Sequence, residues 1–467
     1  MKKRILTLLT CLILILPTVL LCACKDEQTE EQNTNPVASG GILDSLPNAD
    51  LDGRDFVMLT NTGWLNYEDD YNGDPINDTA YERHSYLNQR YNMNYTVSHH
   101  DNTFEVLQNT QMSGDNSFDM MYPHPDYLGR LMTGGLLTDL RTLTAIDFSA
   151  EWHNKSQVEN YTANGKTYLL ASDTTIDTTA FGSIVYNRDR YAALGFTEDL
   201  YQTVYAGNWT MEKFSTMVKD ASANADGAEA TNSYALCFSD KTADTMACAM
   251  GSDILRKNED GQYELGFDNA RMTSICNQIY DLIFDTEGVI HELAYNATYS
   301  TSTFFTAYKG GSSLFLTLDI GSMYNVLREL EFDIGYLPHP KLDTLQKEYR
   351  LFCASGMMAI PTIAKNTQES GIVMEAMAVY SNQYLKPAFI NTILLGRLSE
   401  AGPDFEMLSY LHSIKYYDMG YAMDLEAIAR EIVYVRVIRG QSREIVPALR
   451  SNADKLQAVA DRANSLK

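Results

Sequence analysis

Short apolar runs alternate with helix-like segments between residues 54 and 135, and this alternation constrains the fold more than any other feature. The runs Asp55–Thr60, Met93–Val97 and Phe118–Tyr122 are typical of strands. Helices are expected between and after them, with Asn77 or Asp78 as the first N-cap, and over Glu105–Met112 and Leu128–Met132. Because strand, helix and strand follow one another, the sequence predicts an α/β fold with a parallel sheet.

The rest of the chain continues in α/β style and ends in helices. Further strands are expected within 184–187, 314–316 and 332–336, and helices after Thr210 and after Asp268 or Asn269. Trp209 opens a helix, which favours a packing role for its ring. The last hundred residues predict helices over about 368–385, 404–413, 424–438 and 442–463. A chain of 467 residues that is 45% hydrophobic is long enough for two lobes or more.

The N-terminal segment has the pattern of a secretory signal. Lys2, Lys3 and Arg4 precede an apolar run to Leu21, which is too short for a comfortable membrane span. The ending Leu21-Cys22-Ala23-Cys24 resembles the bacterial lipobox. We therefore expect residues 1–23 to be a lipoprotein signal peptide and Cys24 to carry lipid on the extracytoplasmic face of the cell membrane. A plain signal peptide cut nearby is the alternative. Residues 24–50 are polar and acidic, as in a flexible tether.

Charge and cysteine content exclude several functions. The net charge is −25, and loss of three basic residues with the signal peptide gives −25 − 3 = −28, which argues against a nucleic-acid partner. Four cysteines remain after Cys24, and we expect them to be buried free thiols, although three disulfide pairings are open: Cys237, Cys248, Cys276 and Cys353. No spacing typical of a metal or cofactor site occurs, so neither is expected. Catalytic motifs are absent as well, although a carboxylate pair for glycoside hydrolysis stays open.

Five segments together resemble one known family, the family 1 extracellular solute-binding proteins. These are lipid-anchored receptors of ABC importers, related to maltodextrin-binding protein. The segments, which span about residues 54–380, are Gly73–Arg83 (GDPINDTAYER), Asn164–Asp173 (NGKTYLLASD), Val185–Asp189 (VYNRD), Asn208–Thr210 (NWT) and Phe332–Lys341 (FDIGYLPHPK).

The resemblance implies a two-lobed periplasmic-binding-protein-like fold. The lobes would be joined by more than one crossing strand and would close over a ligand by a hinge. Lobe 1 would comprise residues 51–178 plus about 337–360, and lobe 2 would comprise residues 179–336 plus about 361–467. The ligand would sit in a cleft at the carboxyl ends of the strands.

The resemblance also indicates ligand-binding residues. Tyr122 and Asp126 match positions where relatives place aromatic and acidic contacts, although a proline-stiffened turn would give the same pattern. Trp64 follows the first strand, where its ring could stack on a ligand or could pack in the core. Further candidates are Trp152 in a segment similar to a paired-aromatic motif, Asp173 before the first crossing (or as a turn cap), Asp319 after a strand and Tyr324 beyond it.

The main hypothesis is a monomeric, lipid-anchored receptor without catalytic activity. It would capture a sugar or oligosaccharide by closing around it and deliver it to the transmembrane subunits of an ABC permease. Two other functions remain open at this point: a secreted glycan-active enzyme, and a receptor for a peptide or another small solute. The appearance of new reducing ends on oligosaccharides would identify an enzyme. Competition between sugar and peptide libraries would identify a receptor for peptides.

Overall fold

The computed structural model describes residues 41–61, 70–175, 182–223, 233–292, 303–319, 330–393, 402–428 and 431–466. It divides into two compact units, Met1–Asp44 and Ser45–Lys467. The expected signal peptide, the lipidation site Cys24 and most of the tether therefore lie outside the described residues. Within the second unit, Leu46 and Leu51 are buried, and Arg90 Nη2 donates to the Leu46 carbonyl at 2.9 Å. The last residues assigned to the tether are thus packed against the fold.

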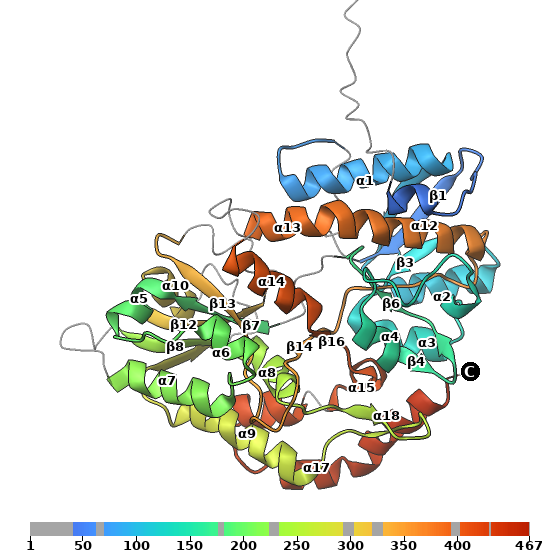
Figure 1. Ribbon diagram of the computed structural model, residues 1–467. Coiled ribbons are helices and arrows are strands. Elements are labelled where there is room, and N and C mark those ends of the chain that lie inside the picture. The colour runs from blue at the N-terminus through green and yellow to red at the C-terminus, as the bar shows by residue number, and fades with distance from the viewer. Residues whose placement is uncertain are drawn as a thin grey trace, which may run out of the picture. The chain divides into compact units, whose positions relative to one another are not determined.

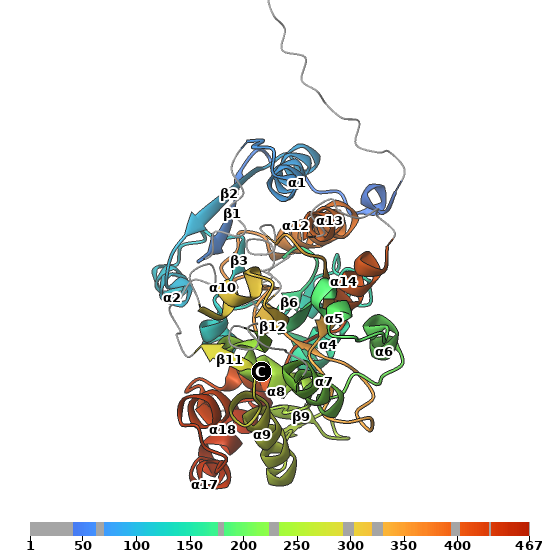
Figure 2. The same cartoon turned by 90° about the vertical axis from the view of Figure 1, so that its left-hand side faces the viewer.

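A three-stranded parallel sheet forms what we call the first lobe. Its order is β2-β1-β3, with β1 at Asp55–Thr60, β2 at Asn94–His99 and β3 at Met120–Tyr122 (Figure 2). Thr60 lies opposite both His99 and Tyr122, so the three carboxyl ends meet in one row. Helices α1 (Pro75–Tyr91) and α2 (Thr103–Ser113) connect the strands, and α3 (Leu128–Thr133) follows β3. The expected alternation of strand and helix is confirmed.

Helix α1 begins earlier than the sequence predicted. Asp74 is the N-cap, and its carboxylate accepts from the backbone N–H groups of Ile76 at 2.9 Å and Asn77 at 3.2 Å. The expectation of Asn77 or Asp78 as the cap was wrong. Pro75 explains the difference, because its fixed φ and missing N–H suit the first position of a helix.

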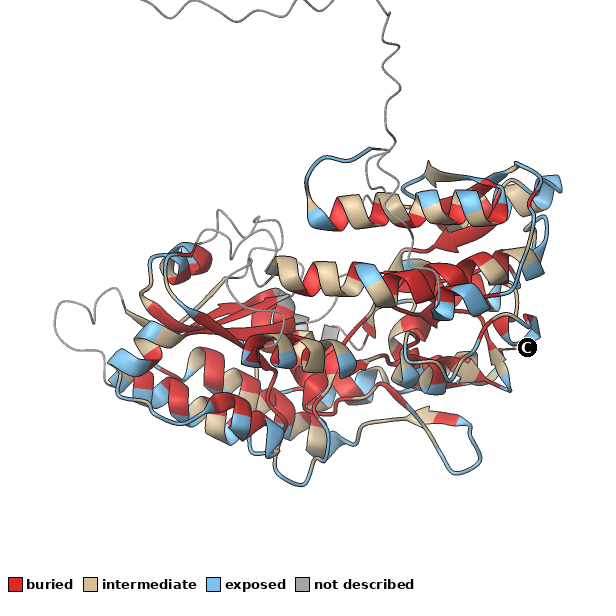
Figure 3. Cartoon of the chain, turned by 45° about the horizontal axis from the view of Figure 1, so that its top comes forward, coloured by how far each residue is buried: buried red, intermediate tan, exposed pale blue. Residues whose placement is uncertain are grey.

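A five-stranded mixed sheet forms the second lobe. Its order is β11-β8-β12-β7-β13. Strands β8 (Tyr234–Ser239), β11 (Val289–Glu292) and β12 (Ser313–Asp319) are parallel, whereas β7 (Gly182–Asn187) runs antiparallel to β12 and to β13 (Ile334–Pro338). Glu292 lies opposite Ser239, so the carboxyl ends of β8, β11 and β12 share one edge of the sheet. The strands predicted here are confirmed, and buried residues fill them (Figure 3).

Trp209 anchors the core of the second lobe, as the sequence predicted. Its ring is fully buried, contacts Phe214 and Phe315, and donates its Nε1–H to the Pro338 carbonyl at 2.9 Å. The following helix α7 spans Met211–Ala223, and α9 spans Asn269–Phe284 with Asp268 as its N-cap. Both helices confirm their predicted starts.

The C-terminal third is helical, with more breaks than expected. The predicted helix over 368–385 is confirmed as α12 (Thr367–Tyr380), which continues through a π-helical segment η9 (Ser381–Leu385) into α13 (Lys386–Ile393). The prediction of a single helix over 424–438 was wrong. Helix α15 (Met419–Met423) ends just before this range, and Ala427 has a φ of 55°. A π-helical segment, η10, then covers Glu431–Arg439. The predicted helix over 442–463 is two helices, α17 (Val446–Ser451) and α18 (Ala453–Asn464); α17 lies beside α9 (Figure 2).

The remaining elements are short. The helical ones are η1 (Ile42–Ser45), η3 (Pro125–Tyr127), η4 (Leu140–Thr142), α4 (Lys155–Tyr161), α5 (Arg188–Ala193), α6 (Leu200–Tyr205), η6 (Asp240–Thr242), α8 (Ala243–Ala249), α10 (Thr303–Lys309), α14 (Pro403–Ser413) and α15 (Met419–Met423). The strands are β4 (Thr162–Ala163), β5 (Lys166–Thr167), β6 (Leu170–Ala171), β9 (Leu255–Lys257), β10 (Tyr263–Leu265), β14 (Leu351–Phe352), β15 (Met357–Met358) and β16 (Lys415–Tyr416).

Contacts of the C-terminal helices bear on the division into lobes. Helices α12 and α13 lie along α1 of the first lobe (Figure 1). Ala359 forms a bridge with Met121 and Pro361 with Leu137, so the chain returns to the first lobe before α12 begins. The assignment of residues 361–467 to lobe 2 stays a prediction, and these contacts favour placing α12 and α13 with the first lobe instead.

Two features bear on redox state and membrane association. The four cysteines after Cys24 are buried and free, as predicted. Among the described helices, none combines the length and apolar character needed to cross a bilayer.

Candidate functional site

A cavity of about 290 Å³ lies between two short helical regions of the described chain. One wall comes from η3 and α3, which directly follow the carboxyl end of β3. The other comes from α15 and the turn after it. The lining residues are Pro125, Asp126, Tyr127 and Arg130 on the first side, and Tyr421, Ala422, Asp424, Leu425, Glu426 and Ala427 on the second. Three acidic side chains, one arginine and two tyrosines therefore surround a space large enough for part of a small polar ligand.

A glycine sets the distance between the two walls. A Cβ on Gly129 of α3 would lie closer than 3.0 Å to the Ala422 carbonyl of α15. Only glycine allows this close approach of one helix to the backbone of the other. On the α15 side, Tyr421 packs against Phe352 of β14 with ring centroids 4.8 Å apart. The two walls are thus in direct contact at Gly129, and the α15 wall is also packed against β14.

Two predicted site residues lie at or just after the end of β3, and only Asp126 lines the cavity. The Asp126 side chain is 59% exposed, and one of its oxygens lies 3.6 Å from His124 Nδ1. Tyr122 is only 3% exposed, and its hydroxyl accepts from the Gly356 N–H at 3.1 Å. Asp126 is therefore available to a ligand, whereas Tyr122 offers almost no ring face in this conformation. The ligand-binding role of each stays a prediction.

The carboxyl edge of the second sheet carries a buried carboxylate–imidazole pair that the sequence reading missed. Asp240 follows β8 and is 4% exposed, and His291 lies on the neighbouring strand β11. His291 Nδ1 is 3.6 Å from Asp240 Oδ1, too far for a hydrogen bond. Neither oxygen of Asp240 has a hydrogen-bond partner among the residues that the structure describes. Burial raises the pKa of Asp240, although His291 opposes this change.

A signal for Asp240 was present in the sequence. The apolar run Ala235–Phe238 is followed by Ser239 and Asp240, the same pattern that drew attention to the residues after Phe118–Tyr122. A polar side chain directly after a buried parallel strand lies at the edge where ligands bind in open sheets. His291 could not be found this way, because its partner strand is known only from the sheet order.

Trp152 and its neighbour are held by one buried carboxylate on α12. Trp152 Nε1 donates to Glu375 Oε1 at 2.9 Å. This bond fixes the indole of a partly buried ring, so Trp152 is oriented by the protein itself. A stacking role toward a ligand stays a prediction.

Asp173 lies in a charged cluster rather than facing open solvent. It is buried, accepts from Asn382 Nδ2 at 2.8 Å, and pairs with Lys386 Nζ at 3.0 Å. Burial alone would raise its pKa, but the positive charges of Lys386 and Lys415 and the hydrogen bond from Asn382 lower it. Burial also lowers the pKa of His412 to about 3, so that ring is neutral at pH 7 and the two lysines supply the positive charge. The cluster joins residues just before the expected first crossing to α13 and α14.

Three predicted site residues cannot be placed. Trp64 and Tyr324 lie outside the described residues, and for Asp319 only the backbone, at the end of β12, is described. Within the described ranges, no group of three or more His, Cys, Asp or Glu side chains could hold a metal ion.

The fold is similar to that of solved two-lobed substrate-binding proteins. Three solved structures match it over nearly their whole length. The ABC substrate-binding protein Lmo0181 from Listeria monocytogenes, in complex with cycloalternan, has a TM-score of 0.55 and 14% identity, covering 87% of this chain and 98% of that one. Apo RafE from Streptococcus pneumoniae has a TM-score of 0.56 and 15% identity, covering 90% and 100%. A cyclo/maltodextrin-binding protein with maltotetraose has a TM-score of 0.57 and 15% identity, covering 88% and 98%.

These similarities confirm the expected fold class, and at this level of identity they concern the fold alone. No protein-family model matches the chain, and no curated protein sequence matches it.

Proposed function

We propose that this protein is a carbohydrate receptor of an ABC importer, anchored through Cys24 on the extracytoplasmic face of the membrane. It binds a sugar or oligosaccharide without altering it and delivers it to the transmembrane permease subunits. The fold supports the receptor class, since structures similar to it are binding proteins seen with cycloalternan, maltotetraose and raffinose. The lipobox-like ending and the basic N-terminal residues support the anchor.

One observation carries the proposal: Asp240 is a buried carboxylate at the carboxyl edge of the second sheet, and neither of its oxygens accepts a hydrogen bond from the described residues, with His291 Nδ1 lying 3.6 Å from Oδ1. A buried polar group without a partner is costly, and each hydrogen bond to a charged group contributes about 1.5–3 kcal/mol. Neighbouring sugar hydroxyls are a matched pair of donors for such a carboxylate. A ligand that donates to Asp240 would therefore favour the bound conformation.

The cavity beside Asp126 supports the same class of ligand. Tyr127 and Tyr421 each line the cavity and carry an aromatic ring and a hydroxyl group, and Asp126 offers an exposed acceptor. Sugars present apolar C–H faces and hydroxyl edges, which match these two kinds of group. The strongly acidic chain disfavours polyanionic ligands.

The test is a thermal-shift screen of the full chain with maltotetraose, raffinose, cycloalternan and a mixture of tripeptides. A sugar that binds raises the unfolding free energy by RT ln(1 + [L]/Kd), about 2.7 kcal/mol at one hundred times Kd. A saturable shift with a sugar, and none with peptides, supports the proposal. A shift with tripeptides only would assign the protein to peptide capture.

The same samples test for catalysis. We expect chromatography to show that each oligosaccharide is intact after prolonged incubation with the protein. New reducing ends would assign the protein to the glycan-active enzymes instead.

A further inference from the structure

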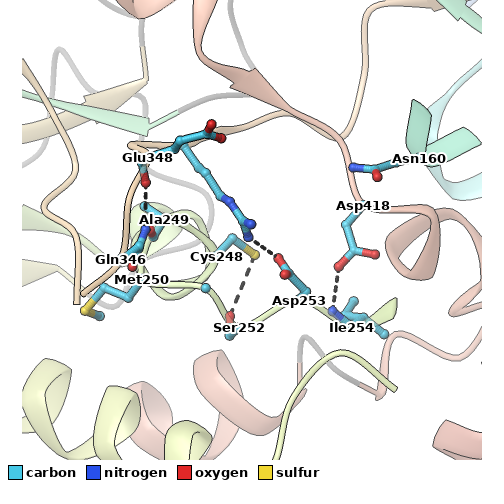
Figure 4. Close-up of polar contacts among 12 residues, drawn as sticks. Asn160, Cys248, Ala249, Met250, Ser252, Asp253, Ile254, Gln346, Glu348 and Asp418 are labelled. Atoms are coloured by element: carbon cyan, nitrogen blue, oxygen red, sulfur yellow. Dashed lines mark hydrogen bonds and ion pairs between the residues drawn. The ribbon is translucent and has the colours of Figure 1, made fainter. Parts of the chain in front are cut away.

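Asp418 joins three separate parts of the chain. Its buried carboxylate accepts from the backbone N–H of Gly420 at 2.7 Å, of Ile254 at 2.5 Å and of Leu255 at 3.2 Å. Its backbone carbonyl accepts from the Tyr161 hydroxyl at 3.1 Å. Figure 4 shows the Asp418 side chain directed at Ile254, beside Asp253. One carboxylate thus ties the start of β9 to the start of α15, at a point where α4 is also attached.

A second carboxylate, Asp253, lies beside Asp418 and is paired with Arg350. Arg350 Nη1 binds Asp253 at 2.6 Å, and its guanidinium lies 4.3 Å from the centre of the Tyr416 ring. Burial and the charge of Asp253 raise the pKa of Asp418 to about 7, against the opposing effect of the three N–H donors. The titratable and charged groups that act on Asp418 or feel its charge are Tyr161, Cys248, Asp253, Tyr263, Arg350 and Tyr416.

Helix α15 connects this junction to the cavity. Asp418 is the N-cap of α15, and Tyr421 and Ala422 of the same helix line the cavity. A Cβ on Gly420 would lie closer than 3.0 Å to the Ile254 side chain, so the first turn of the helix is in tight contact with the chain before β9. The position of one cavity wall therefore depends on the contacts that Asp418 makes.

We propose that Asp418 is a positioning residue, and that gain of a proton by its carboxylate loosens α15 and weakens ligand binding in the cavity. When the carboxylate is ionised, its two oxygens accept all three N–H groups. When one oxygen takes a proton from solvent, it becomes a donor, and at least one of the three bonds weakens. The part of this proposal that concerns the ligand rests on the function proposed above; the part that concerns the junction does not.

Hydrogen exchange of the ligand-free full chain tests the junction. After correction for intrinsic exchange rates, the amides of Ile254, Leu255 and Gly420 should be better protected at pH 8 than at pH 5.5, with a midpoint near neutral pH. Asp418→Asn should abolish this pH step. Asp253→Asn keeps an acceptor for Arg350 but removes the like charge, so it should move the midpoint to lower pH. If Asp418→Asn does not fold, the shift of the midpoint in Asp253→Asn still tests the proposal.

Asp260→Asn is the matched control, because Asp260 lies exposed in the loop between β9 and β10. It should leave the midpoint unchanged. Identical pH dependence in the wild type and Asp418→Asn, or an unmoved midpoint in Asp253→Asn, would overturn the proposal.

Binding of maltotetraose at the two pH values tests the link to the cavity. The wild-type Kd should be several-fold higher at pH 5.5 than at pH 8, and this ratio should fall to near one in Asp418→Asn. An equal ratio in both proteins would refute the link. Absence of maltotetraose binding at either pH would count against the function proposed above, while the exchange midpoints would still decide whether the junction takes up a proton.

Discussion

Glu375 and His153 form a buried pair, with Oε2 of the carboxylate 2.9 Å from Nε2 of the ring. Because the other oxygen of Glu375 accepts from Trp152, a single side chain of α12 orients both aromatic rings of this segment. The segment is bound in turn to the strand region before Asp173, since the Asp173 N–H donates to the Trp152 carbonyl at 2.9 Å. Loss of this carboxylate should therefore lower the free energy of unfolding.

We expect Glu375→Ala to lower the free energy of unfolding by about 1–3 kcal/mol for each buried donor left without an acceptor. Urea unfolding followed by tryptophan fluorescence measures the effect. Glu375→Gln is the control, because its amide oxygen can still accept from Trp152, and it should lose less. Equal losses in the two variants would contradict the role given to these hydrogen bonds.

Gly129→Ala should push α3 away from α15. The added Cβ would meet the Ala422 backbone, which cannot move aside as a flexible side chain would. Overpacking of this kind costs about 1–3 kcal/mol, and here it should also weaken ligand binding by displacing a cavity wall. Gly310→Ala is a matched control, since a Cβ there makes only ordinary contacts of 3.5 Å or more. Calorimetry of both variants, with and without ligand, should separate them; wild-type affinity in Gly129→Ala would contradict the assignment of this wall.

Asp240→Asn tests the proposed role of the buried carboxylate at the carboxyl edge of the second sheet. Replacing one carboxylate oxygen by an amide removes an acceptor and the charge, so loss of a charge-assisted bond worth about 1.5–3 kcal/mol should weaken sugar binding roughly 10- to 100-fold. Isothermal titration with the sugar identified in the screen measures this. Asp260→Asn, an exposed change elsewhere in the chain, should leave Kd unchanged. A normal Kd in Asp240→Asn would remove this residue from the site.

The charged cluster around Asp173 should make stability depend on acid pH. The pKa of Asp173 is lowered below its ordinary value of 3.8, so the folded state binds its proton more weakly than the unfolded state does. This contribution to stability is present above the unfolded pKa and is lost as pH falls through the lower, folded pKa. Unfolding free energies of the wild type should exceed those of Asp173→Asn at pH 7, and the gap should shrink below about pH 4. A gap that is constant down to pH 2 would contradict this account.

The sequence predicted the strands well because each is a compact apolar run with polar neighbours. Asp55–Thr60 and Ile184–Asn187 both contain such runs, and both are strands in the structure. Helix ends were harder, because several polar residues near Pro75 can serve as a cap, and the preference of Pro75 for the first helical position, which points to Asp74, was not taken into account. The break after Met423 was missed for a similar reason, since the sequence between Asp424 and Ile438 has a helical period that Ala427, with its positive φ, interrupts.

Among the predicted site residues, Asp126 lines the cavity, and its role in binding stays a prediction. It was proposed from the resemblance and from its place after a strand, and the same positional argument applied to β8 would have pointed to Asp240. Contacts between residues far apart in the sequence could not be predicted. Lys386 lies 213 positions after Asp173, and neither segment contains a local pattern that indicates the other. The stacking residues Trp64 and Tyr324 stay predictions.

The four buried cysteine thiols make it possible to label the protein at introduced cysteines and to follow its motion in solution. Burial raises the pKa values of Cys237 and Cys276 to about 12, and that of Cys248 also rises. Together with Cys353 they are shielded from alkylating dyes. Cysteines introduced at the exposed positions Ser113 of α2 and Asp220 of α7, a helix that packs on β8, would therefore be the reactive ones beyond residue 40. Fluorophores attached there could report relative movement of the two sheets without replacement of any native cysteine.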